Sequence, residues 1–320
     1  MSMTNGSIVA SQRPAGVPSW KQVFITGLVL WFASVLVTGL TSNLNMIPTV
    51  ILLGSFLVPA TAVVWYLDHY QSAELNPWRV LSAFLVGGVL GVLAASILEA
   101  WLLNDGLLVY LGVGFLEEFA KLLALLIVAR GIAKHTVRDG IVLGAAVGFG
   151  FAALESSGYA FSALLVREGS AVRLSLGSLV FTELLRGILA PVGHGLWTGI
   201  LGGVVFGASR NGHLRLTPGV IGTFILVSLL HGLWDSMRGI ALLLATLLTA
   251  TPVAMPGVGV VLLPPPPERL VSMMTTFEIG GLVLVSLIGL VVLWRQWRTA
   301  PSAAPATSVF RAPAHVHGAT

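Results

Sequence analysis

The sequence contains no cysteine, so disulfide bonds and thiolate metal ligands are excluded at once. Charged residues are also scarce, because Asp, Glu, Lys and Arg together make up 9% of the 320 residues, whereas hydrophobic residues make up 56%. Soluble globular domains carry about 25% charged residues. The composition therefore predicts a membrane protein with one membrane domain, and the small excess of basic residues does not indicate a nucleic acid partner.

Runs of about 20 apolar residues are long enough for a helix to cross a bilayer. They predict eight spans, at 23–40, 46–67, 80–103, 107–130, 140–166, 177–207, 218–247 and 271–294. The expected fold class is an all-α, polytopic transmembrane helix bundle. We expect a polar segment at 1–20, the transmembrane domain at 21–297 and a disordered tail at 298–320. The first span is expected to stay as an anchor, since 1–20 lacks the apolar core of a signal peptide.

The Lys and Arg residues in the connections predict the orientation of the bundle. With the N-terminus inside, eleven of them fall on the cytoplasmic side, and only Arg167, Arg173 and Arg269 fall on the opposite side. Cytoplasmic connections carry the excess of basic residues in membrane proteins. We therefore expect both termini to be cytoplasmic.

The span 107–130 carries three charged residues in its middle, namely Glu117, Glu118 and Lys121. A charged residue at the centre of a transmembrane helix costs about 2.5–3.5 kcal/mol on insertion scales, unless it meets a partner. Lys121 follows Glu117 by four residues and Glu118 by three, so both carboxylates lie within its reach on one helix face. A span with this penalty is by default a candidate functional site.

Later spans carry further ionisable residues. Glu155 ends a small-residue surface formed with Gly144 and Gly148, which favours close helix packing. Pro191 predicts a kink just before His194, because proline removes a helix hydrogen bond.

His231 and Asp235 are one helical turn apart, so the carboxylate could fix the imidazole tautomer. Asp235 could instead pair with Arg238. We expect Glu183 and Arg186 to form a structural ion pair.

Four spans place these residues at a similar depth. Counted from the cytoplasmic ends of the expected spans, Glu118, Glu155, His194 and His231 lie about 12 to 16 residues in, or ~18–24 Å at 1.5 Å per residue. This common depth indicates one polar layer near the middle of the membrane. Glu99 and Glu278 lie near the outer ends of their spans, and we assign them no catalytic role. His315 and His317 in the tail are expected to be solvated.

These residues resemble the PrsW family of bacterial intramembrane proteases, within the superfamily that includes CAAX-prenyl proteases and bacteriocin-processing enzymes. The resemblance covers about residues 112–240. It rests on LEEFAK, on the run that ends at Glu155, on GHGLWT and on LLHGLWD. The first motif ends in Lys121, as in the PrsW family. In the wider superfamily it ends instead in an Arg that lies one residue further along. Ser156 departs from the family, which often has Asn there.

The resemblance implies a membrane endopeptidase of the bacterial plasma membrane, with its catalytic part at about 107–247. Its substrate would be a membrane-anchored protein, for example an anti-sigma factor. The candidate catalytic residues are Glu117, Glu118, Lys121, Glu155, His194, His231 and Asp235.

Peptide hydrolysis needs a base that activates water and an electrophile for the developing oxyanion. Glu117 or Glu118 would be the base, and the resemblance favours Glu117. The histidines would polarise the carbonyl, or would bind a divalent metal such as zinc together with Glu118. Lys121 would keep one carboxylate ionised, and Asp235 would orient His231. The residues are compatible with chemistry with or without a metal.

Three other functions use similar residues. Carboxylates and histidines in the membrane also form proton relays, so a proton-coupled transporter or channel is the main alternative. It predicts internal repeats of matched hydropathy, and we find no convincing repeat between the two halves. A haem protein with His194 and His231 as axial ligands would leave the acidic pair unexplained. A pure scaffold would leave the cost of the buried charges unexplained.

Overall fold

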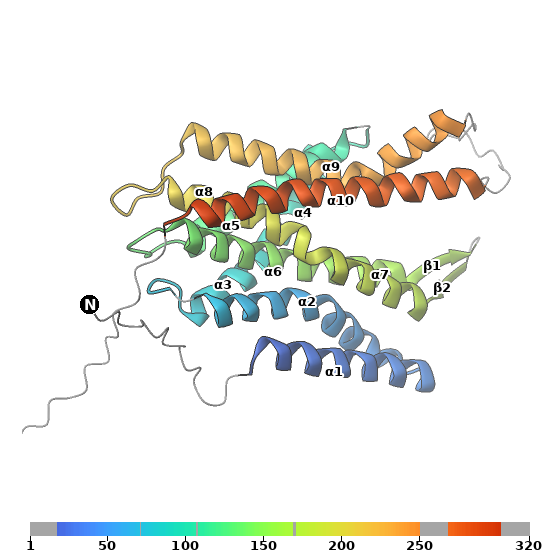
Figure 1. Cartoon of the computed structure of the whole chain (residues 1–320). Helices are drawn as coiled ribbons and strands as arrows, with labels where there is room; N and C mark the ends of the chain where they lie inside the picture. Colours follow the sequence, from blue (N-terminus) through green and yellow to red (C-terminus); the bar gives the residue numbers. More distant parts are fainter. Residues whose placement is uncertain (1–17, 71, 107, 169–170, 250–267, 302–320) are drawn as a thin grey trace, which may run out of the picture.

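The computed structural model describes residues 18–70, 72–106, 108–168, 171–249 and 268–301. These residues form a bundle of long helices that run side by side, with a short hairpin at one end (Figure 1). The expected all-α polytopic fold is therefore confirmed. Most of the polar N-terminal segment, and the tail with His315 and His317, lie outside the described residues.

Each expected span corresponds to one helix or to consecutive helical pieces. The bounds are α1 (Trp20–Thr41), η1 (Leu44–Met46), α2 (Ile47–His69), α3 (Pro77–Val86), η2 (Gly87–Gly91), α4 (Val92–Leu102), α5 (Val109–Val128), α6 (Val137–Leu164), α7 (Leu176–Leu189), η3 (Ala190–Val192), α8 (His194–Gly207), α9 (Pro218–Thr249) and α10 (Glu268–Thr299). The start of α1 and the end of α10 lie at the same end of the bundle, as an even number of crossings requires (Figure 1).

Seven helical segments of the described chain are long and apolar enough to cross a membrane. α5 is different, because its 20 residues include Glu117, Glu118 and Lys121. These three side chains are nevertheless among the most buried polar groups, with exposed fractions of 5%, 0% and 0%. α5 is thus the polar crossing, and its charges face the interior of the bundle.

Local capping explains where several helices begin. The Thr136 hydroxyl accepts a hydrogen bond from the backbone N–H of Asp139 and caps α6. Asn76 does the same for Arg79 at the start of α3, where Pro77 takes the first helical position. Such caps satisfy backbone donors that have no partner within the helix.

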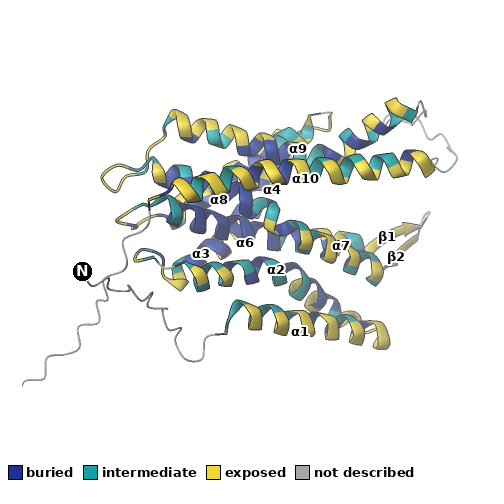
Figure 2. Ribbon diagram, in the orientation of Figure 1, coloured by how far each residue is buried: buried dark blue, intermediate teal, exposed yellow. Residues whose placement is uncertain are grey.

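α6 and α8 form the core of the bundle and pack backbone against backbone. A Cβ added at Gly144 would lie 2.3 Å from the carbonyl oxygen of Thr198, and one at Gly148 would lie 2.2 Å from that of His194. Only glycine allows so close an approach at these positions. Figure 2 shows the buried residues concentrated along these central helices, while the outer helices are largely exposed. The packing surface expected from the small residues before Glu155 is therefore present.

The sixth crossing is interrupted in its middle. α7 ends at Leu189, the 3-10 turn η3 contains Pro191, and α8 begins at His194. This is the interruption that Pro191 predicts. It places His194 at the first position of a new helix, deep in the bundle, with its side chain 13% exposed.

Two short strands join α6 to α7. β1 (Leu165–Glu168) and β2 (Ala171–Leu174) pair antiparallel and form the hairpin at one end of the bundle. The sequence analysis made no prediction about the structure of this connection. The strands Leu165–Leu174 are exposed or partly exposed where described, so no hydrophobic pattern could have identified them.

Candidate active site

Lys121 lies at the centre of the polar layer. Its Nζ donates to Glu117 Oε2 at 3.0 Å and to Glu118 Oε1 at 2.9 Å, both within α5. It also lies 2.8 Å from His194 Nδ1 and 4.1 Å from the centre of the Phe151 ring. The ammonium is therefore held by two carboxylates, an imidazole and an aromatic face, which together replace the water that it loses on burial.

The two adjacent carboxylates of α5 have different surroundings, because successive residues on a helix point about 100° apart. Glu118 is fully buried, and its Oε1 lies 3.1 Å from His231 Nδ1 while its Oε2 accepts from Thr198 at 3.4 Å. Glu117 faces a cavity, and its Oε2 lies 3.6 Å from His231 Nε2. Glu118 is thus positioned to hold His231, and Glu117 to meet a substrate.

The tautomer of His194 follows from its neighbours. The ammonium of Lys121 can only donate, so Nδ1 of His194 accepts and Nε2 carries the hydrogen. Nε2 then donates to Glu155 Oε2 at 2.8 Å. Glu155 also pairs with Arg186, which donates in addition to the Ser156 hydroxyl at 2.7 Å.

The expected ion pair between Glu183 and Arg186 is wrong. Arg186 on α7 turns toward Glu155 and Ser156 on α6. Glu183 instead accepts a hydrogen bond from the indole of Trp31 on α1, at 2.8 Å. The i,i+3 spacing allowed the pair, but two partners on other helices compete for these side chains.

Asp235 lies on the cavity side of His231, as expected from the one-turn spacing on α9. Its Oδ2 is 3.4 Å from His231 Nε2. Arg238, the alternative partner, is exposed. Glu118 is the nearer carboxylate to His231, but it approaches the other ring nitrogen.

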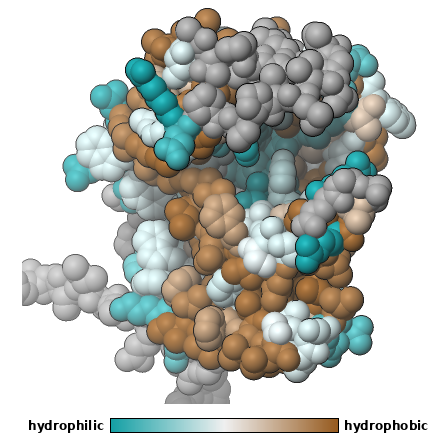
Figure 3. Space-filling view, turned by 90° about the vertical axis from the view of Figure 1, so that its right-hand side faces the viewer, coloured by the Kyte–Doolittle hydropathy of each residue, from teal (hydrophilic) through white to brown (hydrophobic). Residues whose placement is uncertain are grey.

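A polar cavity of about 370 Å³ lies beside these groups. Four carboxyl groups line it, and they belong to Glu99, Glu117, Glu155 and Asp235. Tyr110 and Tyr159 line it as well, toward the end of the bundle that carries the hairpin. That end, seen in Figure 3, has a recess with hydrophilic residues at its floor.

Glu99 is the cavity residue to which the sequence analysis gave no role. It lies in the last turns of α4, close to the end of the expected span, where a charged residue can reach water. Its spacing could have revealed its orientation, because Glu99 follows the buried Ala95 by four residues and so lies on the same helix face. Glu99 therefore belongs among the residues that line this cavity.

Glu117, His194 and His231 form a possible set of metal ligands. One ligand atom from each lies within 4.8 Å of the other two. His194 Nδ1 and His231 Nε2 lie 3.7 and 3.6 Å from Glu117 Oε2, close to the ~3.4 Å between ligands of a tetrahedral zinc ion. The sequence analysis chose Glu118 for this set. The geometry favours Glu117, because Glu118 is turned to Lys121 and to the far nitrogen of His231.

The two imidazole rings lie close together, with centroids 4.9 Å apart and planes at 83°. This spacing leaves no room for a porphyrin between them, so the axial-haem alternative is wrong. The rings, the acidic pair and the lysine occupy one continuous polar centre that involves α5, α6, α8 and α9.

A comparison with protein-family models finds a match that covers the helices of the polar centre. The model of a family described as PrsW family intramembrane metalloprotease matches residues 76–262. The chain belongs to the PrsW family. It is also 28% identical to Protease PrsW of Halalkalibacterium halodurans over 195 residues, which cover 58% of this chain and 82% of the relative. No solved structure matches the chain.

PrsW family membership makes this chain an integral membrane protein of the intramembrane protease class. The matched region begins at the start of α3 and continues beyond α9, so it includes each of the helices around the polar centre. α1, α2 and α10 lie outside it. The resemblance stated from the motifs alone is therefore confirmed.

Proposed function

We propose that this chain hydrolyses a peptide bond of a membrane-anchored protein at the cavity in front of Glu117. The observation that carries the proposal is the convergence of Glu117, His194 and His231, whose ligand or catalytic atoms lie within 4.8 Å of one another beside a 370 Å³ cavity. The substrate class includes membrane-anchored regulators such as anti-sigma factors. The catalytic part is about 107–247.

Glu117 is the proposed general base. It takes a proton from water as the water oxygen attacks the carbonyl carbon, and it returns that proton to the leaving amine when the C–N bond breaks. Lys121 donates a hydrogen bond to the carboxylate at 3.0 Å and so fixes its position beside the cavity. Glu117 is preferred to Glu118 because it lines the cavity, whereas Glu118 is fully buried.

His231 is the proposed electrophile. Glu118 Oε1 lies 3.1 Å from its Nδ1, and its Nε2 lies between Glu117 and Asp235, which both line the cavity. A hydrogen on Nε2 can donate to the carbonyl oxygen as negative charge develops there. His194 donates its own hydrogen to Glu155 and so has a positioning role, with Arg186 holding Glu155 from the far side.

A divalent metal also fits this site. Glu117, His194 and His231 supply a carboxylate and two imidazoles, the donor set of many catalytic zinc sites. When bound, such an ion would activate water and polarise the carbonyl. Lys121 contacts two of the same three ligand atoms, so its ammonium would have to move away from them before they could bind an ion. Glu118, which lies 3.1 Å from Nδ1 of His231, would then hold that ring from the nitrogen that does not bind the ion.

The test is cleavage of a membrane-anchored reporter by purified protein in lipid nanodiscs. We expect Glu117→Gln to lower kcat about 10²–10⁴-fold because the base is removed, while the protein stays folded because Glu118 still pairs with Lys121. His194→Ala and His231→Ala should also lower kcat, and Glu268→Gln, at an exposed site on α10, should not.

Metal content, measured by mass spectrometry beside the activity, separates the two forms of the mechanism. A bound ion that is lost in His231→Ala identifies metal-assisted hydrolysis. Cleavage by Glu117→Gln at the wild-type rate would show that Glu117 is not the base. Loss of activity and melting temperature together in all variants would show that the polar centre is structural only.

We propose, from the family and its bacterial relative, that the protein lies in a bacterial plasma membrane, and, from the loop charges, that both termini are cytoplasmic. The hairpin end, onto which the cavity opens, is then on the outer side. Cleavage would therefore occur in the outer half of the membrane.

A further inference from the structure

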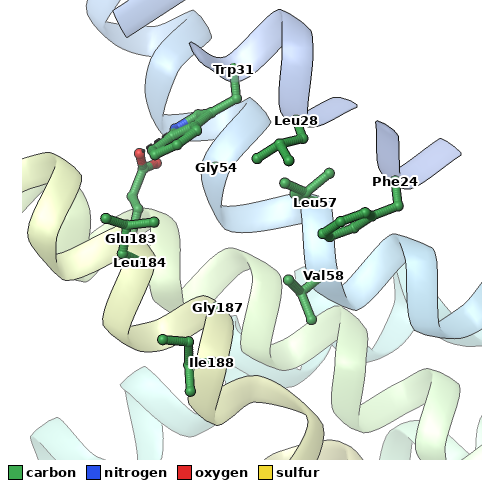
Figure 4. A pocket seen from close by; sticks show the side chains of 10 residues that line it. All are labelled: Phe24, Leu28, Trp31, Gly54, Leu57, Val58, Glu183, Leu184, Gly187 and Ile188. Carbon is green, nitrogen blue, oxygen red and sulfur yellow. Dashed lines mark hydrogen bonds between the residues drawn. The ribbon is translucent and has the colours of Figure 1, made fainter. Parts of the chain in front are cut away.

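A second cavity, away from the polar centre, contains a buried carboxyl group. It measures about 170 Å³ and lies between α1, α2 and α7 (Figure 4). Its walls are almost entirely apolar and include Leu28, Leu57 and Ile188. Glu183 lies at one end, with 4% of its surface exposed, and Gly54 makes room for its carboxyl group.

Only one oxygen of this carboxyl group has a partner. Trp31 donates to Oε2 at 2.8 Å, whereas the buried Oε1 has no hydrogen-bond partner among the described residues. A buried polar atom without a partner costs about 1–3 kcal/mol, and the apolar walls around it supply none. The unpaired atom therefore indicates a ligand with a hydrogen-bond donor.

The cavity continues toward one end of the bundle. A neighbouring cavity of about 420 Å³ shares Phe24 and Val58 with it and reaches Trp20 and Trp65. Trp20 precedes Trp31 by 11 residues, which is about 16 Å along α1. The two cavities together suit a single hydrocarbon chain that lies along α1 and α2. We call these two adjoining cavities the α1–α2 groove.

We propose that the α1–α2 groove binds an uncharged membrane lipid that carries a hydroxyl group. The hydroxyl donates to Glu183 Oε1, and the chain runs past Phe24 and Val58 toward Trp20. A headgroup with a phosphate is disfavoured because the residues that line the cavity include no Lys or Arg to accompany the burial of its negative charge, and Glu183 is itself acidic. A transmembrane helix is too wide, since three helices already enclose the 170 Å³ around Glu183.

The experiment measures quenching of Trp31 fluorescence by brominated probes in nanodiscs that contain the full chain. The probes are 4,5-dibromohexadecan-1-ol, whose bromines lie close to the hydroxyl and so to Trp31, and the matched alkane, 4,5-dibromohexadecane. Trp31 is one of 9 tryptophans, so the Trp31→Phe variant supplies the background to subtract. We expect the alcohol to quench Trp31 at about fivefold lower concentration than the alkane, as one hydrogen bond allows.

Two variants test the two parts of the proposal. Glu183→Leu should remove the preference for the alcohol and keep the binding of the alkane. Ile188→Trp changes a residue that is 74% exposed, so folding should be kept, and it should weaken both probes by filling the cavity.

Equal quenching by both probes in the wild type, or an alcohol preference that persists in Glu183→Leu, would overturn the proposal. So would quenching that only a transmembrane reporter peptide can displace, because the occupant would then be a substrate helix. The activity of the polar centre does not enter this measurement, so a failure here is independent of the proposed protease mechanism.

Discussion

The polar centre and the α1–α2 groove both bury carboxyl groups inside the membrane, and they compensate for that burial in opposite ways. In the centre, Lys121 lies within 3.0 Å of two carboxylates and Arg186 pairs with a third. In the groove, Glu183 has one neutral indole donor and no cation beside it in the described structure. The carboxylates of the centre are paired with cationic side chains of the protein, whereas Oε1 of Glu183 in the groove is left free to accept from a ligand.

This difference also appears in the packing. Helices α6 and α8 meet backbone to backbone around the centre, where an added Cβ has no space. Around the groove the glycine on α7 is less confined, since a Cβ at Gly187 would lie 3.6 Å from Val58. A rigid centre suits chemistry that needs fixed distances, and an open groove suits a variable occupant.

The largest effect is expected from Lys121→Met, which removes the cation shared by Glu117 and Glu118. Breaking a buried ion pair costs about 3–5 kcal/mol, because a fully buried charge loses its partner. Thermal unfolding in nanodiscs should show a large loss of stability. The double variant Lys121→Met/Glu118→Gln should recover much of it, and Lys134→Met, at an exposed site, should change nothing. Equal stability of Lys121→Met and wild type would show that the centre does not depend on this ammonium.

A single methyl group at the α6–α8 contact should have the next largest effect. In Gly148→Ala the new Cβ would lie 2.2 Å from the carbonyl oxygen of His194, so the helices must separate. Overpacking costs about 1–3 kcal/mol, and the shift of His194 should also lower kcat. Gly187→Ala is the matched variant beside the groove and should be tolerated. Similar losses for both variants would remove the contrast in packing.

Trp31→Phe tests the neutral partner of Glu183. It leaves a buried carboxyl group without a donor, which should lower stability by about 1–3 kcal/mol and leave kcat unchanged. The double variant Trp31→Phe/Glu183→Leu replaces both partners by apolar groups and should recover the loss. If the double variant is no more stable than the single one, the hydrogen bond between α1 and α7 is not the source of the effect.

The smallest effect concerns a contact at the end of the bundle, where Tyr70 donates to Asp139 and joins α2 to α6. Burial, and then the nearby carboxylate, raise the pKa of Tyr70 from 10.0 to about 12. A raised pKa stabilises the folded state below pH 10, and this contribution is lost as the pH rises from about 10 to 12. Tyr70→Phe should therefore flatten the fall of the melting temperature over that range. An identical fall in both proteins would exclude this contact as its cause.

The sequence predicted the crossings and the polar layer because both depend on local patterns. Apolar runs give span positions directly, and the common depth of Glu118, Glu155, His194 and His231 follows from counting along helices. The partners could not be predicted in the same way. Arg186 pairs with Glu155 rather than with Glu183, and Glu117 rather than Glu118 faces the cavity. Both outcomes depend on how the helices are rotated relative to each other, which the sequence does not give. Glu99 was missed for the same reason.

The interruption between α7 and α8 has a consequence for the supply of water. α7 and α8 have 14 residues each, or ~21 Å, so neither crosses the ~30 Å hydrocarbon layer alone. Their junction, at Ala190 to Gly193, interrupts the α-helix at membrane depth, which is tolerated where the backbone is buried in protein or lines a cavity. Ala190, Gly193 and His194 line a cavity of about 70 Å³ with Glu155 and Asp235. This cavity is polar and large enough to admit water, and a hydrolase that works at this depth needs water there.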